Sequence, residues 1–227
     1  MDEPPSTAIV TGIRAIGHGR QRLITLNDGR DLAVSAEACA RVPELSVGAE
    51  ATGPILAALD AAERHVLAHE AALRLLSSRS RSETEMRARL AMRGIDPATI
   101  EDELVRLRNS GLLDDQKFAR AWVEDRKRMA PRGRRMLRYE LLGRGIEPES
   151  VDVATDGIDD RETALEIART RARGGALASY DTFLTKVGGF LRRRGFDYAL
   201  VVEVTRMVWT EATGSPAELP AGDLAPD

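Results

Sequence analysis

An eleven-residue segment occurs three times in this chain, and its recurrence limits the possible folds more than any other feature. Its copies span Leu90–Ile100, Leu141–Val151 and Leu191–Val201, and they read LAMRGIDPATI, LLGRGIEPESV and LRRRGFDYALV. Each copy places a leucine four residues before a glycine, an arginine directly before that glycine, and an isoleucine or valine six residues after it. Successive glycines are 51 and 50 residues apart. Such a period indicates helical repeat units that bury their apolar faces against their neighbours.

The first copy carries the signals of two helices joined by a tight bend. Ser82 and Glu85 form a capping box, which predicts a helix from there to Arg93. Gly94 stands where a left-handed residue ends a helix at little steric cost. The Asp-Pro pair at 96–97 supplies an N-cap and a first-turn proline for the next helix. The leucine before the glycine and the aliphatic residue after it should therefore face each other across the bend.

Another predicted helix precedes each pair. These three helices are expected over Ala61–Ser78, Asp115–Met129 and Asp160–Arg173. The chain is therefore predicted to be mainly α, with three tandem three-helix repeats of helix-turn-helix type. We place the limits of these repeats at 59–113, 114–159 and 160–212.

The N-terminal part has a different pattern, because short alternating runs typical of strands replace the helical period. Asn27–Gly29 is a hairpin turn signal between the runs RLITL and RDLAVS, and TAIVTGIRAI is a third candidate strand. A lone hairpin needs more surface to pack on, so we predict a small β-rich domain over residues 7–58. Residues 1–6 and the acidic tail 213–227 are expected to be disordered.

The net charge of −3 conceals an uneven distribution of charge. Residues 72–212 hold 27 basic and 23 acidic side chains, whereas residues 1–71 hold 6 and 10, and residues 213–227 hold none and 3. The repeats are thus the basic part of the chain. A single cysteine, no long apolar run and no secretory signal lead us to expect a cytoplasmic protein without a disulfide or a membrane span.

No constellation of catalytic residues is evident. His65 and His69 are four residues apart on a predicted helix, but no glutamate follows the first histidine as in zinc-binding helices. The acidic pairs at 114–115 and 159–160 stand at predicted helix starts, where capping explains them better than acid–base chemistry. We therefore expect no enzyme activity, no metal site and no cofactor.

The strongest candidate for a binding site is the segment EDRKRMAPRGRRMLRYE, which places seven cations within thirteen residues around a turn between two helices. These residues, which we call the basic corner, are Arg126, Lys127, Arg128, Arg132, Arg134, Arg135 and Arg138. Such a corner attracts phosphates or an acidic protein surface. The alternative is a solvated face whose cations pair with Glu124, Asp125 and Glu140.

Arginines also precede the glycines of the repeats. Arg192 and Arg193 belong to a run of three before Gly195, and we include these two in the predicted binding surface. The arginine directly before each glycine has two possible roles. It contacts carbonyls at the helix C-terminus, or it projects toward a partner.

Residues from about 65 to 212 resemble the RecX family of RecA regulators. Four segments carry the resemblance: ALRLLSSRSRSETEMRARLAMRGI, LVRLRNSGLLDDQKFARAWVEDR, PRGRRMLRYELLGRGI and KVGGFLRRRGFDYALV. The order Gly-Leu-Leu-Asp-Asp followed by Phe-Ala is the most specific of these matches. The β-rich start is similar to an N-terminal segment of longer members.

The resemblance implies an elongated, curved body of three-helix motifs without enzyme activity. It implies a protein that binds the RecA filament on single-stranded DNA and lowers its ATP hydrolysis, strand exchange and growth, and we expect this protein to be a monomer. These properties would place the protein in homologous recombination, DNA repair and the SOS response. Carried over to this chain, the basic part of the family falls on PRGRRMLRYEL.

A second hypothesis is direct DNA binding through the basic middle repeat, since helix-turn-helix units commonly bind DNA. That hypothesis predicts a steep salt dependence of binding to naked DNA. The low aromatic content of 4% offers little surface for stacking single strands and therefore favours the RecA hypothesis.

Overall fold

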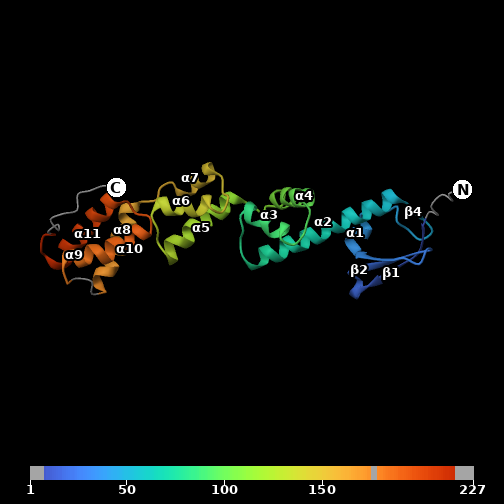
Figure 1. The fold of residues 1–227 in the computed structure, drawn as a ribbon, viewed down its shortest axis with the longest axis horizontal. Helices are drawn as coiled ribbons and strands as arrows, with labels where there is room; N and C mark the ends of the chain where they lie inside the picture. The colour runs from blue at the N-terminus through green and yellow to red at the C-terminus, as the bar shows by residue number, and fades with distance from the viewer. Residues whose placement is uncertain (1–7, 175–177, 218–227) are drawn as a thin grey trace. The chain divides into compact units, whose positions relative to one another are not determined.

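The computed structural model describes residues 8–174 and 178–217. The chain forms two compact units, one ending at Leu113 and the other beginning at Asp114 (Figure 1). The predicted disordered start, 1–6, and the part of the predicted acidic tail from residue 218 onward lie outside the described residues. Within the described ranges, no helix has the length and apolarity required to cross a membrane.

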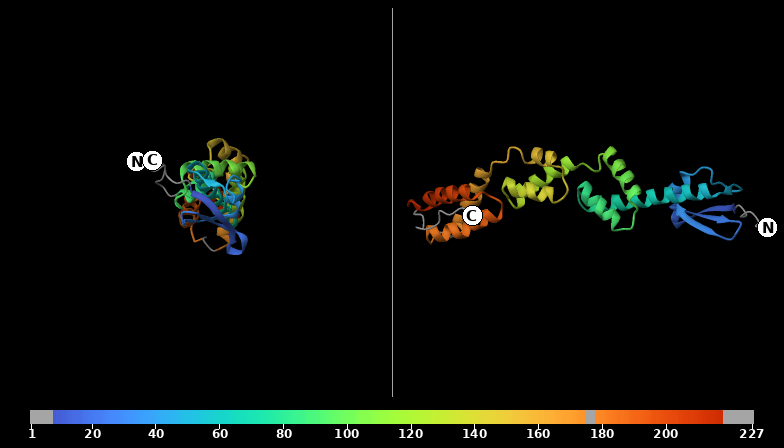
Figure 2. Two further views of the ribbon diagram at one scale, coloured as in Figure 1. Left: turned by 90° about the vertical axis from the view of Figure 1, so that its right-hand side faces the viewer. Right: turned by 45° about the horizontal axis from the view of Figure 1, so that its top comes forward.

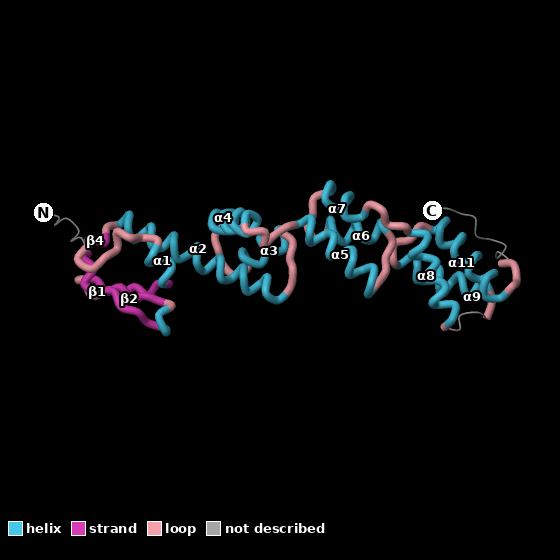
Figure 3. The backbone as a smooth tube through the Cα atoms, turned by 180° about the vertical axis from the view of Figure 1, so that it is seen from behind, coloured by secondary structure: helices cyan, strands magenta, loops and turns pink. Residues whose placement is uncertain are grey.

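The first unit opens with a four-stranded antiparallel sheet, and among the described residues strands occur only in this part of the chain (Figure 3). The strands are β1 (Ala8–Ile16), β2 (Gln21–Leu26), β3 (Asp31–Ser35) and β4 (Glu50–Ala51), in the order β3-β2-β1-β4. The predicted hairpin turn joins β2 to β3, with Gly29 at φ +86°. A short helix, α1 (Ala36–Ala40), follows β3.

One helix serves both the sheet and the first repeat, and its start differs from our prediction. Helix α2 spans Gly53–Ser78, whereas we predicted a start at Ala61. The Gly-Pro pair at its beginning resembles a turn in sequence. Proline is tolerated in a first helical turn, however, because the N–H groups there lack helical partners in any case. The expected domain limit at residue 58 therefore lies inside a continuous helix.

The two ends of α2 belong to different cores. Leu59 and Val66 pack with residues of the sheet, whereas Ala72 and Leu75 pack with the helices of the first repeat. The ribbon in Figure 2 shows the first part of this helix beside the strands. This packing joins the β-rich start to the first repeat.

The remaining helices follow the predicted order. The first repeat continues with α3 (Glu83–Ala91) and α4 (Pro97–Asn109). The second contains α5 (Asp115–Met129), α6 (Arg134–Leu142) and α7 (Pro148–Thr155). The third contains α8 (Asp160–Arg173), α9 (Tyr180–Phe183), the π-helical turn η2 (Leu184–Gly188), α10 (Gly189–Arg193) and α11 (Tyr198–Thr213). Helices α5 and α8 begin and end at the predicted residues, while the residue limits expected for the repeats stay predictions.

The interpretation of the eleven-residue segment as a helix–bend–helix element is confirmed. Gly94, Gly145 and Gly195 all have positive φ, at +78°, +75° and +92°. The leucine and the aliphatic residue of each copy share one core, as in the pair Leu90 and Ile100. The predicted caps form in the first copy, where Ser82 Oγ accepts from the Glu85 N–H at 3.1 Å.

A close backbone contact joins the second and third repeats within the second unit. The N–H of Gly133, which is the N-cap of α6, donates to the carbonyl of Arg194 at 2.9 Å. A Cβ on Gly133 would lie 2.9 Å from the Gly195 oxygen, and a Cβ on Gly195 would lie 2.5 Å from Met136 Cβ. Only glycines fit here, and we call this contact the repeat junction.

The junction predicts a difference between two glycine substitutions in the same unit. Gly157 also has positive φ, at +71°, but nothing lies within 4 Å of a Cβ built there. We expect Gly157→Ala to lose about 1 kcal/mol through backbone strain, and Gly195→Ala to lose about 1–3 kcal/mol more through overpacking. Urea unfolding followed by the fluorescence of Trp122 and Trp209 measures both variants. Equal losses would contradict the tight contact.

Candidate interaction surface

Five of the seven cations in the basic corner pair with carboxylates. Arg126 Nε lies 2.9 Å from Glu140 Oε2, and Arg132 pairs with the other oxygen of the same carboxylate. The remaining pairs are Lys127–Glu124 at 3.0 Å, Arg128–Asp125 at 2.6 Å, and Arg138–Asp152. The alternative interpretation, a face of ion-paired cations, thus describes most of the corner.

Glu140 is the centre of a partly buried network on the second repeat. Its carboxylate, only 11% exposed, accepts from Trp122 Nε1 at 2.8 Å and from Arg126. The guanidinium groups of Arg126 and Arg144 lie over the Trp122 ring, 4.1 and 3.6 Å from its centroid. Burial acts to raise the pKa of Glu140, but the hydrogen bonds from Arg126 and Trp122 and the charge of Arg132 outweigh it and lower that pKa. This network ties α5 to α6.

Two cations of the corner remain available to a partner. Within the described residues, the side chains of Arg134 and Arg135 form no ion pair or hydrogen bond; Arg135 is exposed and Arg134 half-buried. Both follow Gly133 directly at the start of α6.

The repeat junction brings the second group of arginines to the same place. Arg192 and Arg193 are exposed at the end of α10, and the carbonyl of Arg194 accepts from the Gly133 N–H. The Arg192 guanidinium lies 5.5 Å from the centroid of the Tyr198 ring. Two basic segments about sixty residues apart in sequence therefore meet at the junction. We call Arg134, Arg135, Arg192 and Arg193 the junction surface.

The arginine before each glycine donates to a backbone carbonyl in all three repeats. Arg93 reaches Arg89 O at 3.1 Å, and Arg144 reaches Glu140 O at 2.9 Å, each one turn back in its own helix. Arg194 instead reaches Pro131 O of the preceding repeat at 2.9 Å. In two repeats this arginine contacts a carbonyl near the C-terminus of its own helix, which is the first of our two alternatives. In the third repeat, the arginine helps to close the repeat junction.

Sequence reasoning missed the role of Asp160. Asp159 caps its own helix, as predicted, by accepting from the Glu162 N–H at 2.9 Å. Asp160 accepts from the Arg134 N–H at 2.7 Å, where the N-cap Gly133 has no side chain to do so. Burial raises the pKa of Asp160, although this hydrogen bond acts in the opposite direction. The only signal in the sequence was a helix start without a capping side chain.

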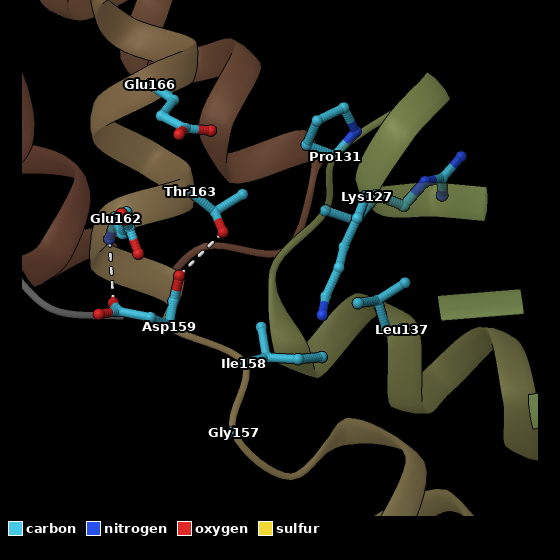
Figure 4. Close-up of a pocket in the computed structure, with 10 residues that line it drawn as sticks. Lys127, Pro131, Leu137, Gly157, Ile158, Asp159, Glu162, Thr163 and Glu166 are labelled. Carbon is cyan, nitrogen blue, oxygen red and sulfur yellow. Dashed lines mark hydrogen bonds between the residues drawn. The ribbon is translucent and has the colours of Figure 1, made fainter. Parts of the chain in front are cut away.

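A cleft of about 320 Å³ lies beside the junction (Figure 4). Lys127, Pro131 and Leu137 line one side, and Asp159, Thr163 and Glu166 are among the residues of the other. Charges of both signs face this cleft, which makes it a poor receptor for a nucleic acid. The exposed arginines of the junction surface carry the stronger electrostatic signal.

The histidines of α2 contact acidic residues of α4. His69 Nδ1 lies 2.7 Å from Glu103 Oε1, and Glu103 is only 2% exposed. His65 Nε2 lies 3.8 Å from Asp102. Over the described ranges, no group of three or more His, Cys, Asp or Glu side chains is arranged to hold a metal ion.

Comparison with known proteins identifies related repeats and a related fold. The models of the first and second three-helix domains of RecX match residues 68–107 and 114–154. Regulatory protein RecX of Mycobacterium avium (strain 104) is 36% identical over 136 residues, covering 58% of this chain and 79% of the relative. The Mycobacterium leprae (strain Br4923) protein of the same name is also 36% identical over 136 residues, covering 58% and 80%.

Two crystal structures share the fold. A structure of regulatory protein RecX aligns with a TM-score of 0.71 at 22% identity, covering 87% of this chain and 98% of that one. RecX from Lactobacillus salivarius aligns with a TM-score of 0.58 at 21% identity, covering 65% and 97%. The predicted fold class, helical repeats after a small β-rich start, is confirmed.

The Glu140 network predicts a specific response to acid. Because the folded protein lowers the pKa of Glu140, its ionised form adds stability above the ordinary value of 4.5, and this stability is lost as the pH falls through the lowered pKa. Glu140→Gln should therefore lose about 2 kcal/mol at neutral pH and show a shallower loss of stability in acid. Urea unfolding at a series of pH values measures both effects. Glu149→Gln, which alters an exposed carboxylate on α7, is the control, and identical profiles for the two variants would refute this role.

Proposed function

Because this chain belongs to the RecX family of regulatory proteins, we propose that it regulates RecA by binding the RecA nucleoprotein filament on single-stranded DNA. In this proposal it acts as a cytoplasmic monomer without catalysis or cofactor, and it lowers ATP hydrolysis, strand exchange and filament growth. The family membership supports the choice of RecA as partner.

The observation that carries the proposed contact is the junction surface. Its four arginines come from two segments whose backbones meet through the Gly133–Arg194 hydrogen bond, and they have no carboxylate partner within the described residues. Guanidinium groups bind both carboxylates and phosphates in bidentate geometry. A nucleoprotein filament presents both groups, so it suits a surface of unpaired arginines on a chain whose net charge is −3.

Direct DNA binding remains the second candidate, and one observation favours it. Tyr139 and Tyr198 are 75% and 47% exposed, and they are two of only three tyrosines in the chain. Both lie within three residues of the contact between Met136 and Gly195. Exposed rings beside arginines are suited to stacking on bases of single strands. The low aromatic content is therefore a weaker argument against DNA binding than the sequence suggested.

The proposed function predicts the effect of reversing charge in the junction surface. The purified chain should lower the single-strand-dependent ATPase activity of RecA from the same organism. Arg134→Glu combined with Arg135→Glu should raise the concentration needed for half inhibition about tenfold or more, a cost of at least about 1.4 kcal/mol. The matched control combines Arg89→Glu with Arg106→Glu, two exposed arginines of the first repeat without ion pairs in the described residues.

The outcomes of this assay separate the hypotheses. Equal effects of the two double variants would remove the junction surface from the proposal. Unchanged ATPase activity at a several-fold excess of wild-type chain, together with no co-sedimentation with filaments, would refute RecA regulation. Binding to naked single strands that weakens steeply with salt would favour the second candidate.

A further inference from the structure

The β1–β2 hairpin is a basic element of the β-rich domain, whose other residues carry more acidic than basic side chains. Residues 8–27, which form this hairpin, contain three arginines and one histidine and no Asp or Glu. The rest of residues 1–71 contains three arginines and ten acidic side chains. The positive charge of the sheet domain is therefore concentrated on one pair of strands. It lies outside residues 68–107 and 114–154, which the RecX models match.

The end of this hairpin is a preformed turn. The Arg20 N–H donates to Gly17 O at 3.3 Å, and the two central residues, His18 and Gly19, have φ of +58° and +84°. Two positive φ values are the mark of type I′ turns, whose twist matches that of the flanking strands. The Arg22 guanidinium holds the turn from inside, donating to Gly19 O at 2.9 Å and Gln21 O at 3.2 Å.

The other basic side chains of the hairpin are exposed and unpaired. Arg14, His18 and Arg20 are exposed, and across the part of the chain that the structure describes none of them forms an ion pair. Elsewhere in the same domain, Arg30 pairs with Asp28 at 2.7 Å and Arg41 pairs with Glu37 at 2.6 Å. The domain thus neutralises its other exposed arginines and leaves those at the hairpin end free to bind an anion.

We propose that the end of the β1–β2 hairpin binds the phosphate backbone of duplex nucleic acid through Arg14 and Arg20, with His18 between them. Guanidinium groups match the geometry of phosphate, so exposed arginines at the end of the hairpin suit the backbone of a nucleic acid. The five acidic side chains in the rest of the β-rich domain repel nucleic acid and confine the contact to the hairpin.

Two absences on the hairpin argue against other partners. Residues 8–27 contain no Phe, Tyr or Trp, so they lack the large rings on which the bases of a single strand stack. The only large apolar side chain exposed on this segment is Ile9, at 39%, which lies at the far end from the turn. A protein interface is normally anchored by buried aromatic or apolar side chains, and the end of the hairpin offers none.

The test compares two double variants of the full chain that change the charge equally. Arg14→Gln with Arg20→Gln removes the unpaired arginines, whereas Arg30→Gln with Arg41→Gln removes two exposed, ion-paired arginines of the same domain. Fluorescence anisotropy with a labelled duplex of about 20 base pairs, two helical turns, gives the dissociation constant at several salt concentrations. Circular dichroism checks that both variants fold.

We expect Arg14→Gln with Arg20→Gln to weaken duplex binding about tenfold at low salt. The slope of log K against log salt should also become shallower by about 1.8, since each lost phosphate contact contributes about 0.9. The control should keep the wild-type slope.

An unchanged slope, an equal change in the control, or a wild-type chain that does not bind the duplex would overturn the proposal. If Arg14→Gln with Arg20→Gln kept duplex binding but no longer co-sedimented with RecA filaments, the proposal would be overturned, and the hairpin would instead bind an acidic protein surface. Because inhibition of the RecA ATPase is measured in a separate assay, the result of the duplex-binding test does not depend on whether the proposed function is correct.

Discussion

The contact between Gly133 and Gly195 is the constraint on which the second unit depends. It allows the start of α6 to lie against the bend of the third repeat, with backbone atoms close enough for the Gly133 N–H to bond Arg194 O. Asp160 and the Arg194 side chain then complete the contact by bonding the Arg134 N–H and Pro131 O. A side chain at either glycine would separate these groups, so the arrangement of the exposed arginines depends on two residues without side chains.

A count of the cations in the basic corner overestimates its binding surface. Of the seven basic residues between 126 and 138, five pair with carboxylates, and two of these share Glu140. Partly buried guanidinium groups in such a network hold helices together and have little freedom to turn toward a partner. The unpaired arginines of the second repeat are joined by other exposed arginines only because the repeat junction brings the segment with Arg192 and Arg193 to the start of α6.

Much of the fold could be predicted because its signals are local. The starts of α5 and α8 follow from Asp114 and Asp159, which cap the helices that begin one residue later. The bends follow from Gly94, Gly145 and Gly195, whose positive φ is difficult for other residues. The start of α2 could not be predicted from Gly53-Pro54, because a Gly-Pro pair is equally compatible with a turn and with a first helical turn. Packing of Leu59 and Val66 on the sheet favours the helix.

The sequence by itself determined the three bends, the caps and the helical repeats, because each depends on residues a few positions apart. The tertiary structure decided which charges are available. Arg138 meets Asp152 across 14 residues, and the Arg134 N–H meets Asp160 across 26. No local pattern encodes such pairs, since they exist only when helices distant in sequence pack together. The physical reason is that a charge binds a partner only where the fold leaves it exposed and without a carboxylate of its own.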